Sequence, residues 1–402
     1  IKPFMEALME VSSLDELTDF LLSEDNYKYG SFLVPIGLTL YGEDSNRYEV
    51  GIYKPSLLLG DAAEYRDLTP NGERMKTYRD AVASYMLGRF GMTEAEIGDT
   101  IEKAYAFDEK LSKFEKTLLE QYDPSYLKES INMVKMEDIK EMSPDFPLPA
   151  YLEKYGWAAS ELIDVEWPEA IRGLNDLYIE ENFEEIKAAL LVRDASTYIS
   201  LLDEEAYRES QRLSNDYSGV MESEPDEELA YSETRGIFPD SFARLYIDRC
   251  LTEEMRQDIT KICQDCIDTY SEMFDEEDWL SEETRRYAKE KLEKMKINAV
   301  YPDKWEDYSI YHVTPVEEGG TYFDAVMDSG LANDERSRER INGTVDKDIW
   351  GVDILQTNAF YNPSDNSINI IRGLLGGIFY RDGMSDEELL DSVDRIQEAF
   401  GL

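Results

Sequence analysis

The sequence predicts a mainly α-helical protein, in which a large helical domain contains a small β-hairpin and is followed by a second β-hairpin. Two observations support this fold class. Serine or threonine followed by acidic residues precedes stretches whose apolar residues recur every three or four positions, which is typical of capped amphipathic helices. Alternating or β-branched runs are instead concentrated near residues 32–53 and 350–371. With 402 residues, 42% of them hydrophobic, the chain is long enough for two or three domains.

The charge balance is strongly acidic. Asp and Glu number 88 against 41 Lys and Arg, for a formal net charge of −47, and a field of this sign repels nucleic acid and anionic membranes. The longest apolar run, residues 188–192, is far shorter than the ~18–20 residues of a transmembrane helix. We therefore expect no nucleic-acid partner and no membrane-spanning segment in this chain. A bacterial cytoplasm and a cell surface are both compatible with these features, and no pattern predicts an oligomeric state.

Helix starts are indicated by local capping patterns. Ser13, Thr93 and Ser281 are each followed within three residues by acidic side chains, which suit the N-terminal end of a helix. The helix from Thr93 is expected to reach about Leu119, and the helix from Ser281 to end near Lys296. Apolar periodicity predicts further helices at residues 71–90, 125–142, 148–161, 167–182, 183–192, 198–213 and 239–250.

Two β-hairpins are predicted, one near each end of the chain. Residues 32–41 and 48–53 flank a polar loop at 42–46, which reads as a hairpin with a five-residue loop. In the second β region, Trp350, Val352 and Ile354 alternate with other residues. Residues 358–362 continue as an extended segment, and the turn at 363–366 leads into a strand at 367–371.

Acidic runs occur at residues 222–228 and 275–278. Neither has the ligand spacing of a calcium-binding loop. We interpret the first as a solvated loop and the second as a helix junction.

The single histidine, His312, limits the possible chemistry. A helix-borne H-E-x-x-H zinc site needs two imidazoles on one helical face, so this chain cannot build one. A Ser-His-Asp or Cys-His arrangement would have to use His312, which lies in an aromatic stretch at 308–313 without a nucleophile arranged beside it. We interpret His312 as an ordinary, partly packed residue.

The cysteines also favour a structural interpretation. Cys263 and Cys266 form a C-x-x-C pair, but apolar residues recur around them at three- and four-residue spacing. We therefore expect both thiols to be buried on one helical stripe, reduced and without a metal. Cys250 makes the total odd, which disfavours a disulfide framework.

Several blocks of sequence are characteristic enough to compare with known enzymes. The main blocks lie at residues 238–246 (F-P-D-S-F-A-R-L-Y), 278–284 (D-W-L-S-E-E-T), 301–308 (Y-P-D-K-W-E-D-Y) and 357–363 (T-N-A-F-Y-N-P). Shorter blocks lie at 44–48 (D-S-N-R-Y) and 146–152. In sequence and in order these blocks resemble the neprilysin and endothelin-converting-enzyme family of zinc metallopeptidases, including its bacterial oligopeptidases.

The resemblance implies a domain organisation and a substrate class. Residues 1–345 would form a helical lid domain that faces a thermolysin-like catalytic domain across a closed chamber. Residues 346–390 would form the β-hairpin edge of that catalytic domain, and residues 391–402 a C-terminal piece. The implied function of the intact parent is zinc metalloendopeptidase activity on oligopeptides, with zinc bound by the parent and none bound by this chain.

The same resemblance implies that Asn358 and Ala359 bind substrate. An extended peptide would lie antiparallel to their strand, with Asn358 holding the peptide backbone and Ala359 offering its carbonyl. An exposed strand edge can bind peptide backbone in this way. The alternative is an ordinary hairpin in which Asn358 only shapes the turn.

The sequence departs from the family after the second hairpin. Residues 384–390 resemble the approach to the family's zinc-binding helix, but residues 391–402 contain no H-E-x-x-H. We expect a catalytic segment to be missing between Leu390 and Asp391, so that this chain is a fragment or joined pieces of a longer protein and is inactive alone. The alternative is a catalytically dead pseudo-peptidase that acts as a peptide- or protein-binding scaffold.

Overall fold

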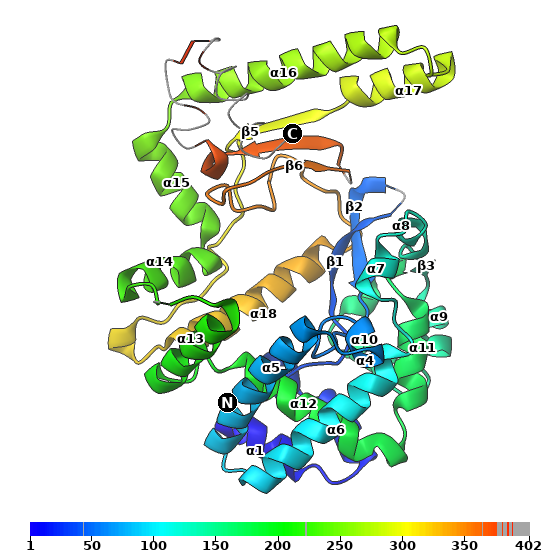
Figure 1. Ribbon diagram of the computed structural model, residues 1–402, viewed down its shortest axis with the longest axis vertical. Helices are drawn as coiled ribbons and strands as arrows, with labels where there is room; N and C mark the ends of the chain where they lie inside the picture. Colours follow the sequence, from blue (N-terminus) through cyan, green and yellow to red (C-terminus); the bar gives the residue numbers. More distant parts are fainter. Residues whose placement is uncertain are drawn as a thin grey trace. The chain divides into compact units, whose positions relative to one another are not determined.

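The computed structural model describes residues 1–375 except 43, 222 and 364, together with residues 380, 384, 385 and 388. Helices dominate these residues, which confirms the predicted fold class (Figure 1). The chain divides into two compact units: unit 1 comprises Ile1–Pro225 and Tyr311–Thr344, and unit 2 comprises Asp226–Ile310 and Val345–Leu402. The range 1–345 therefore includes parts of both units, and its role as a lid stays a prediction. None of the described helices is long and apolar enough to cross a membrane.

Unit 1 is mainly a helical assembly. Three short 3-10 helices, at Trp157–Ala159, Glu180–Asn182 and Val316–Glu318, link some of its elements. Its α-helices are α1 (Lys2–Glu10), α2 (Leu14–Leu21), α3 (Glu24–Tyr29), α4 (Ala63–Arg66), α5 (Pro70–Arg89), α6 (Glu94–Ser112), α7 (Leu118–Gln121), α8 (Tyr126–Glu129), α9 (Met136–Met142), α10 (Leu148–Lys154), α11 (Pro168–Leu177), α12 (Phe183–Thr197), α13 (Glu204–Ser218) and α18 (Tyr322–Arg340).

The core of unit 1 lies where α12 packs against α5 and α6 (Figure 1). Phe107 and Leu111 of α6 are fully buried, as are Ile186 and Leu190 of α12. Within each pair the residues lie four positions apart and therefore share a helical face. The apolar periodicity of the sequence thus corresponds to a real helix–helix interface.

The predicted helix starts in unit 1 are confirmed by their caps. The Ser13 hydroxyl accepts a hydrogen bond from the Glu16 amide, with an N–O distance of 3.2 Å. Thr93 and Glu96 form a reciprocal capping box at the start of α6. These bonds satisfy backbone amides that have no partner inside the helix.

Some predicted helix lengths are wrong, and competing caps explain two of them. The helix from Thr93 ends at Ser112 rather than Leu119, because Thr117 caps a separate helix, α7. Leu118, the first residue of α7, is 49% exposed. The helix expected at 198–213 begins at Glu204, where the Asp203 carboxylate accepts a hydrogen bond from the Ala206 amide.

A four-stranded sheet completes unit 1, with strand order β1-β2-β4-β3. Its strands are β1 (Ile36–Tyr41), β2 (Asp44–Ile52), β3 (Met133–Val134) and β4 (Ile163–Val165). β1 and β2 form the predicted antiparallel hairpin, but Tyr41 pairs with Asp44 across a register shift. The second strand therefore begins four residues before the predicted Tyr48. β3 interrupts the helix predicted at 125–142, because its residues pair with β4.

Unit 2 contains α14 (Asp226–Ile237), α15 (Pro239–Cys250), α16 (Glu253–Glu276) and α17 (Glu282–Glu293). α15 matches the predicted range, and α16 ends inside the acidic run at 275–278, as expected for a helix junction. The run at 222–228 is only partly a loop, because its last three residues form the first turn of α14. Acidic side chains are favourable there because the N-terminal end of a helix carries a partial positive charge.

A three-stranded sheet in unit 2 has strand order β5-β7-β6. β5 (Lys296–Val300) runs parallel to β7 (Ser367–Ile371), and β6 (Ala359–Asn362) runs antiparallel to β7. The hairpin of β6 and β7 confirms the strands predicted around the turn at 363–366. α16 lies along β5 and covers part of the sheet through Met255, Ile259 and Cys263 (Figure 1).

The strand suggested by Trp350, Val352 and Ile354 does not form. Trp350 and Ile354 are buried with Ala243 and Ile371 in a separate cluster. Their alternation therefore reflects an irregular segment that packs its apolar side chains inward. Alternation alone does not distinguish this arrangement from a half-buried strand.

Candidate functional site

The two candidate substrate-binding residues lie at the start of an edge strand. Ala359 is the first residue of β6, Asn358 directly precedes it, and both are exposed. Because β6 pairs only with β7 in the sheet order, its other side, here called the open edge, has no partner strand among the described residues. Asn358 and Ala359 thus form one accessible segment next to unpaired backbone groups.

The direction of the backbone carbonyls along β6 follows from one contact. The Asn369 side-chain amide on β7 donates to the Phe360 carbonyl, with an N–O distance of 3.5 Å, so this carbonyl points toward β7. Carbonyl directions alternate along a strand. The carbonyls of Ala359 and Tyr361 therefore point toward the open edge, where an added peptide strand could donate to them.

A buried polar ladder holds the strands in register. Asn298 on β5 donates to the Asn369 Oδ1 atom at 2.8 Å, and Asn369 donates to the Ser367 Oγ atom at 2.9 Å. All three side chains are less than 5% exposed. Buried amides of this kind favour one strand register, because a shift would leave them without partners. Ser367 and Asn369 alternate with isoleucines in the sequence, a signal from which this polar face could have been predicted.

Tyr361 lies on the same face of the sheet as Ala359, since side chains two residues apart point the same way. Its hydroxyl donates to the Asn366 Oδ1 atom at 3.0 Å, and the Asn366 amide donates to the Lys291 carbonyl at 2.9 Å. The Lys291 ammonium lies 5.1 Å from the centroid of the Tyr361 ring. Sequence reasoning missed this cluster because Lys291 and Tyr361 are far apart in the chain, although Tyr361 lies in the block at 357–363.

The described residues offer no site for a metal ion, since no group of three or more His, Cys, Asp or Glu side chains among them could hold one. His312 is exposed rather than partly packed.

Cys263 is buried, and burial raises the pKa of its thiol to about 11. Cys266 is exposed, so the expectation that both thiols are buried is wrong. Only the narrow stripe of α16 that faces the sheet is covered.

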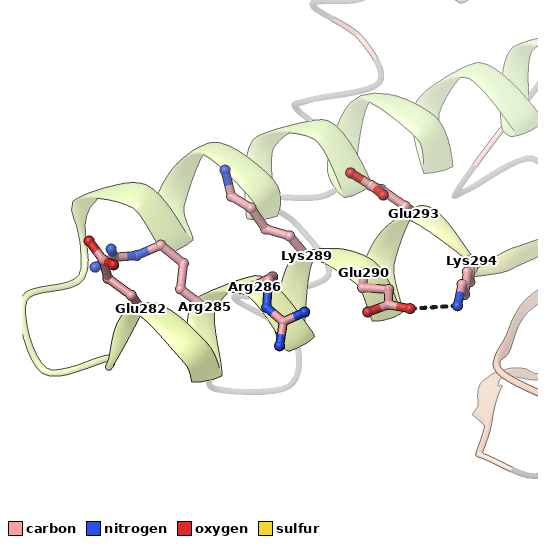
Figure 2. A pocket seen from close by; sticks show the side chains of 7 residues that line it. All are labelled: Glu282, Arg285, Arg286, Lys289, Glu290, Glu293 and Lys294. Carbon is pink, nitrogen blue, oxygen red and sulfur yellow. Dashed lines mark hydrogen bonds and ion pairs between the residues drawn. The ribbon is translucent and has the colours of Figure 1, made fainter.

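A hollow of about 710 Å³ runs along α17 (Figure 2). Several of its charged side chains already have partners. Arg285 donates to the Phe274 and Glu277 carbonyls at the end of α16, Lys289 pairs with Asp275 at 2.6 Å, and Lys294 pairs with Glu290 at 2.6 Å. These contacts fasten α17 to α16 or bridge one turn of α17, which favours a structural role for the hollow. Its lining residues are Glu282, Arg285, Arg286, Lys289, Glu290, Glu293 and Lys294.

Comparison with known proteins gives one matching family model. Residues 1–302 match the N-terminal model of peptidase family M13. The chain is 23% identical over 326 residues to a neutral endopeptidase of Lactobacillus helveticus, covering 81% of this chain and 49% of the relative. It is 24% identical over 327 residues to a putative zinc metalloproteinase of Streptococcus gordonii, covering 81% of this chain and 57% of the relative. The chain thus spans about half the length of these relatives.

Solved structures share the fold. The crystal structure of PEPO from Lactobacillus rhamnosis superposes with a TM-score of 0.86 at 18% identity, over 99% of this chain and 63% of that one. The zinc metalloprotease ZMP1 of Mycobacterium tuberculosis, in complex with an inhibitor, superposes with a TM-score of 0.82 at 19% identity, over 96% of this chain and 57% of that one. At these identities the likeness establishes the fold.

Proposed function

Because this chain belongs to peptidase family M13, we propose that it is part of a neprilysin-like zinc metalloendopeptidase that cleaves oligopeptides. Its relatives are named as neutral endopeptidases and a zinc metalloproteinase. In this proposal the chain supplies the helical wall of a closed chamber and the strand on which the peptide lies. A closed chamber would admit short peptides and exclude folded proteins.

The observation that carries the proposal is the open edge of β6, with Asn358 and Ala359 exposed at its start. An extended peptide can add to such an edge as a further strand, and main-chain hydrogen bonds then supply affinity whatever its side chains are. The Asn358 amide can donate to and accept from the peptide backbone. The Ala359 carbonyl would accept from a peptide N–H.

The described residues of this chain do not form a binding site for the zinc of the proposed enzyme, because no set of donor side chains comes together among them. We place its ligands in a catalytic segment missing between Leu390 and Asp391. No catalytic step is therefore assigned to a residue of this chain. Its contribution is to bind and orient the peptide.

The test compares the 402-residue chain with the protein encoded by the complete reading frame. The complete protein should bind zinc stoichiometrically and cleave short peptides but not folded proteins. The 402-residue chain should bind no zinc and cleave no peptide. Sequencing across the Leu390–Asp391 junction gives an independent readout. An uninterrupted junction together with a zinc-free, inactive product would refute the enzyme and favour a peptide- or protein-binding scaffold.

A further inference from the structure

We propose that Tyr361 and Lys291 form a side-chain subsite beside the open edge of β6 that selects an acidic residue in the bound peptide. This inference rests on the proposed function, because it needs a peptide to lie along β6. It goes further by assigning a sequence preference to an edge that otherwise binds only backbone.

The position of the selected residue follows from strand geometry. A peptide antiparallel to β6 would place one residue opposite Ala359, and the residue two positions before it in the peptide would face Tyr361. Hydrogen-bonded antiparallel residues have Cα atoms about 5.5 Å apart, with side chains on the same face of the sheet. The peptide side chain opposite Tyr361 would therefore lie beside its ring, on the face where Lys291 is found.

The subsite is already arranged before any peptide binds. The Tyr361 hydroxyl is held by Asn366, and Asn366 is held by the backbone of Lys291. Tyr361 is 40% exposed, so a neighbouring strand can reach it. A side chain that is already positioned loses little conformational freedom on binding, which favours affinity.

The charge of Lys291 determines the preferred partner. No ion pair of Lys291 is found among the described residues, whereas Lys294, three residues on, is paired with Glu290 at 2.6 Å (Figure 2). The chain carries a net charge of −47, and this field disfavours acidic peptides at long range. At physiological salt, however, charges separated by more than about 8 Å are largely screened. The nearby ammonium therefore dominates the choice, and it favours Asp or Glu.

The experiment measures binding of labelled extended peptides to the 402-residue chain by fluorescence anisotropy. Glu, Gln or Lys is placed at each peptide position in turn. At one position only, Glu should bind about 1.5- to 5-fold more tightly than Gln, as expected for an exposed ion pair, and Lys more weakly than Gln. The difference should shrink as salt is added.

Lys291→Glu should invert the order at that position, so that the Lys peptide binds best. Lys294→Glu is the matched control, since it makes the same charge change on the same helix but should leave the order unchanged. Equal binding of the three peptides at every position, or an order unaffected by Lys291→Glu, would overturn the subsite while leaving the proposed function intact. Failure of every peptide to bind would overturn both.

Discussion

The Asn358→Ala substitution tests the proposed substrate strand most directly. The Asn358 side chain is exposed, and no hydrogen bond of this side chain is found among the described residues. Its removal should therefore change the free energy of unfolding by no more than about 0.5 kcal/mol, as for most surface substitutions. If the amide holds a peptide through one or two hydrogen bonds, each contributing roughly 0.5–1.5 kcal/mol, kcat/KM should fall about 2- to 100-fold.

The assay is steady-state cleavage of a short peptide by the complete enzyme, with melting temperatures measured on the same preparations. Asn71→Ala is a matched control, because Asn71 is also exposed and lies on α5, in unit 1. This control should change neither quantity. The clamp assignment would have to be dropped if Asn358→Ala left peptide turnover untouched and lowered the melting temperature by several degrees. Asn358 would then belong to the internal bonding of the hairpin.

Three further predictions concern the chain itself. Burial raises the pKa of Asp194 to about 7, so the stability that its protonated carboxyl contributes to the folded state is lost as pH rises from about 4 to 7. The free energy of unfolding of Asp194→Asn, relative to that of the unsubstituted protein, should therefore increase over this pH range. A difference between the two proteins that does not change with pH in chemical denaturation would contradict this. A thiol reagent should label Cys266 rapidly and Cys263 slowly in the folded protein, as measured by mass spectrometry of the labelled peptides. Faster labelling of Cys263 than of Cys266 would contradict this prediction. Phe107→Ala should cost about 3–5 kcal/mol of stability, because it empties a fully buried site; an unchanged unfolding midpoint in urea would refute that burial.

Helix starts and hairpins could be predicted because their bonds are local. Ser13 and Thr93 each accept a hydrogen bond from an amide three residues on, so a short stretch of sequence contains both partners. The hairpin of β6 and β7 is similar, because a turn of a few residues sets its register. The candidate residues Asn358 and Ala359 were located through a resemblance carried by a contiguous block, and their role stays a prediction.

The features that the sequence did not reveal depend on distant partners. β5 was missed because its partner β7 follows about 70 residues later, and no local pattern specifies a parallel pairing of that kind. Cys263 and Cys266 share an apolar stripe, but only contact with the sheet determines which of them is covered. The contact between Lys291 and Tyr361 likewise exists only once β7 brings β6 beside the end of α17. Local hydrogen bonds and apolar periodicity thus determined many of the helix starts and both hairpins of this protein. The pairing of β5, and burial and charge at the edge of β6, were decided by packing between segments far apart in the chain.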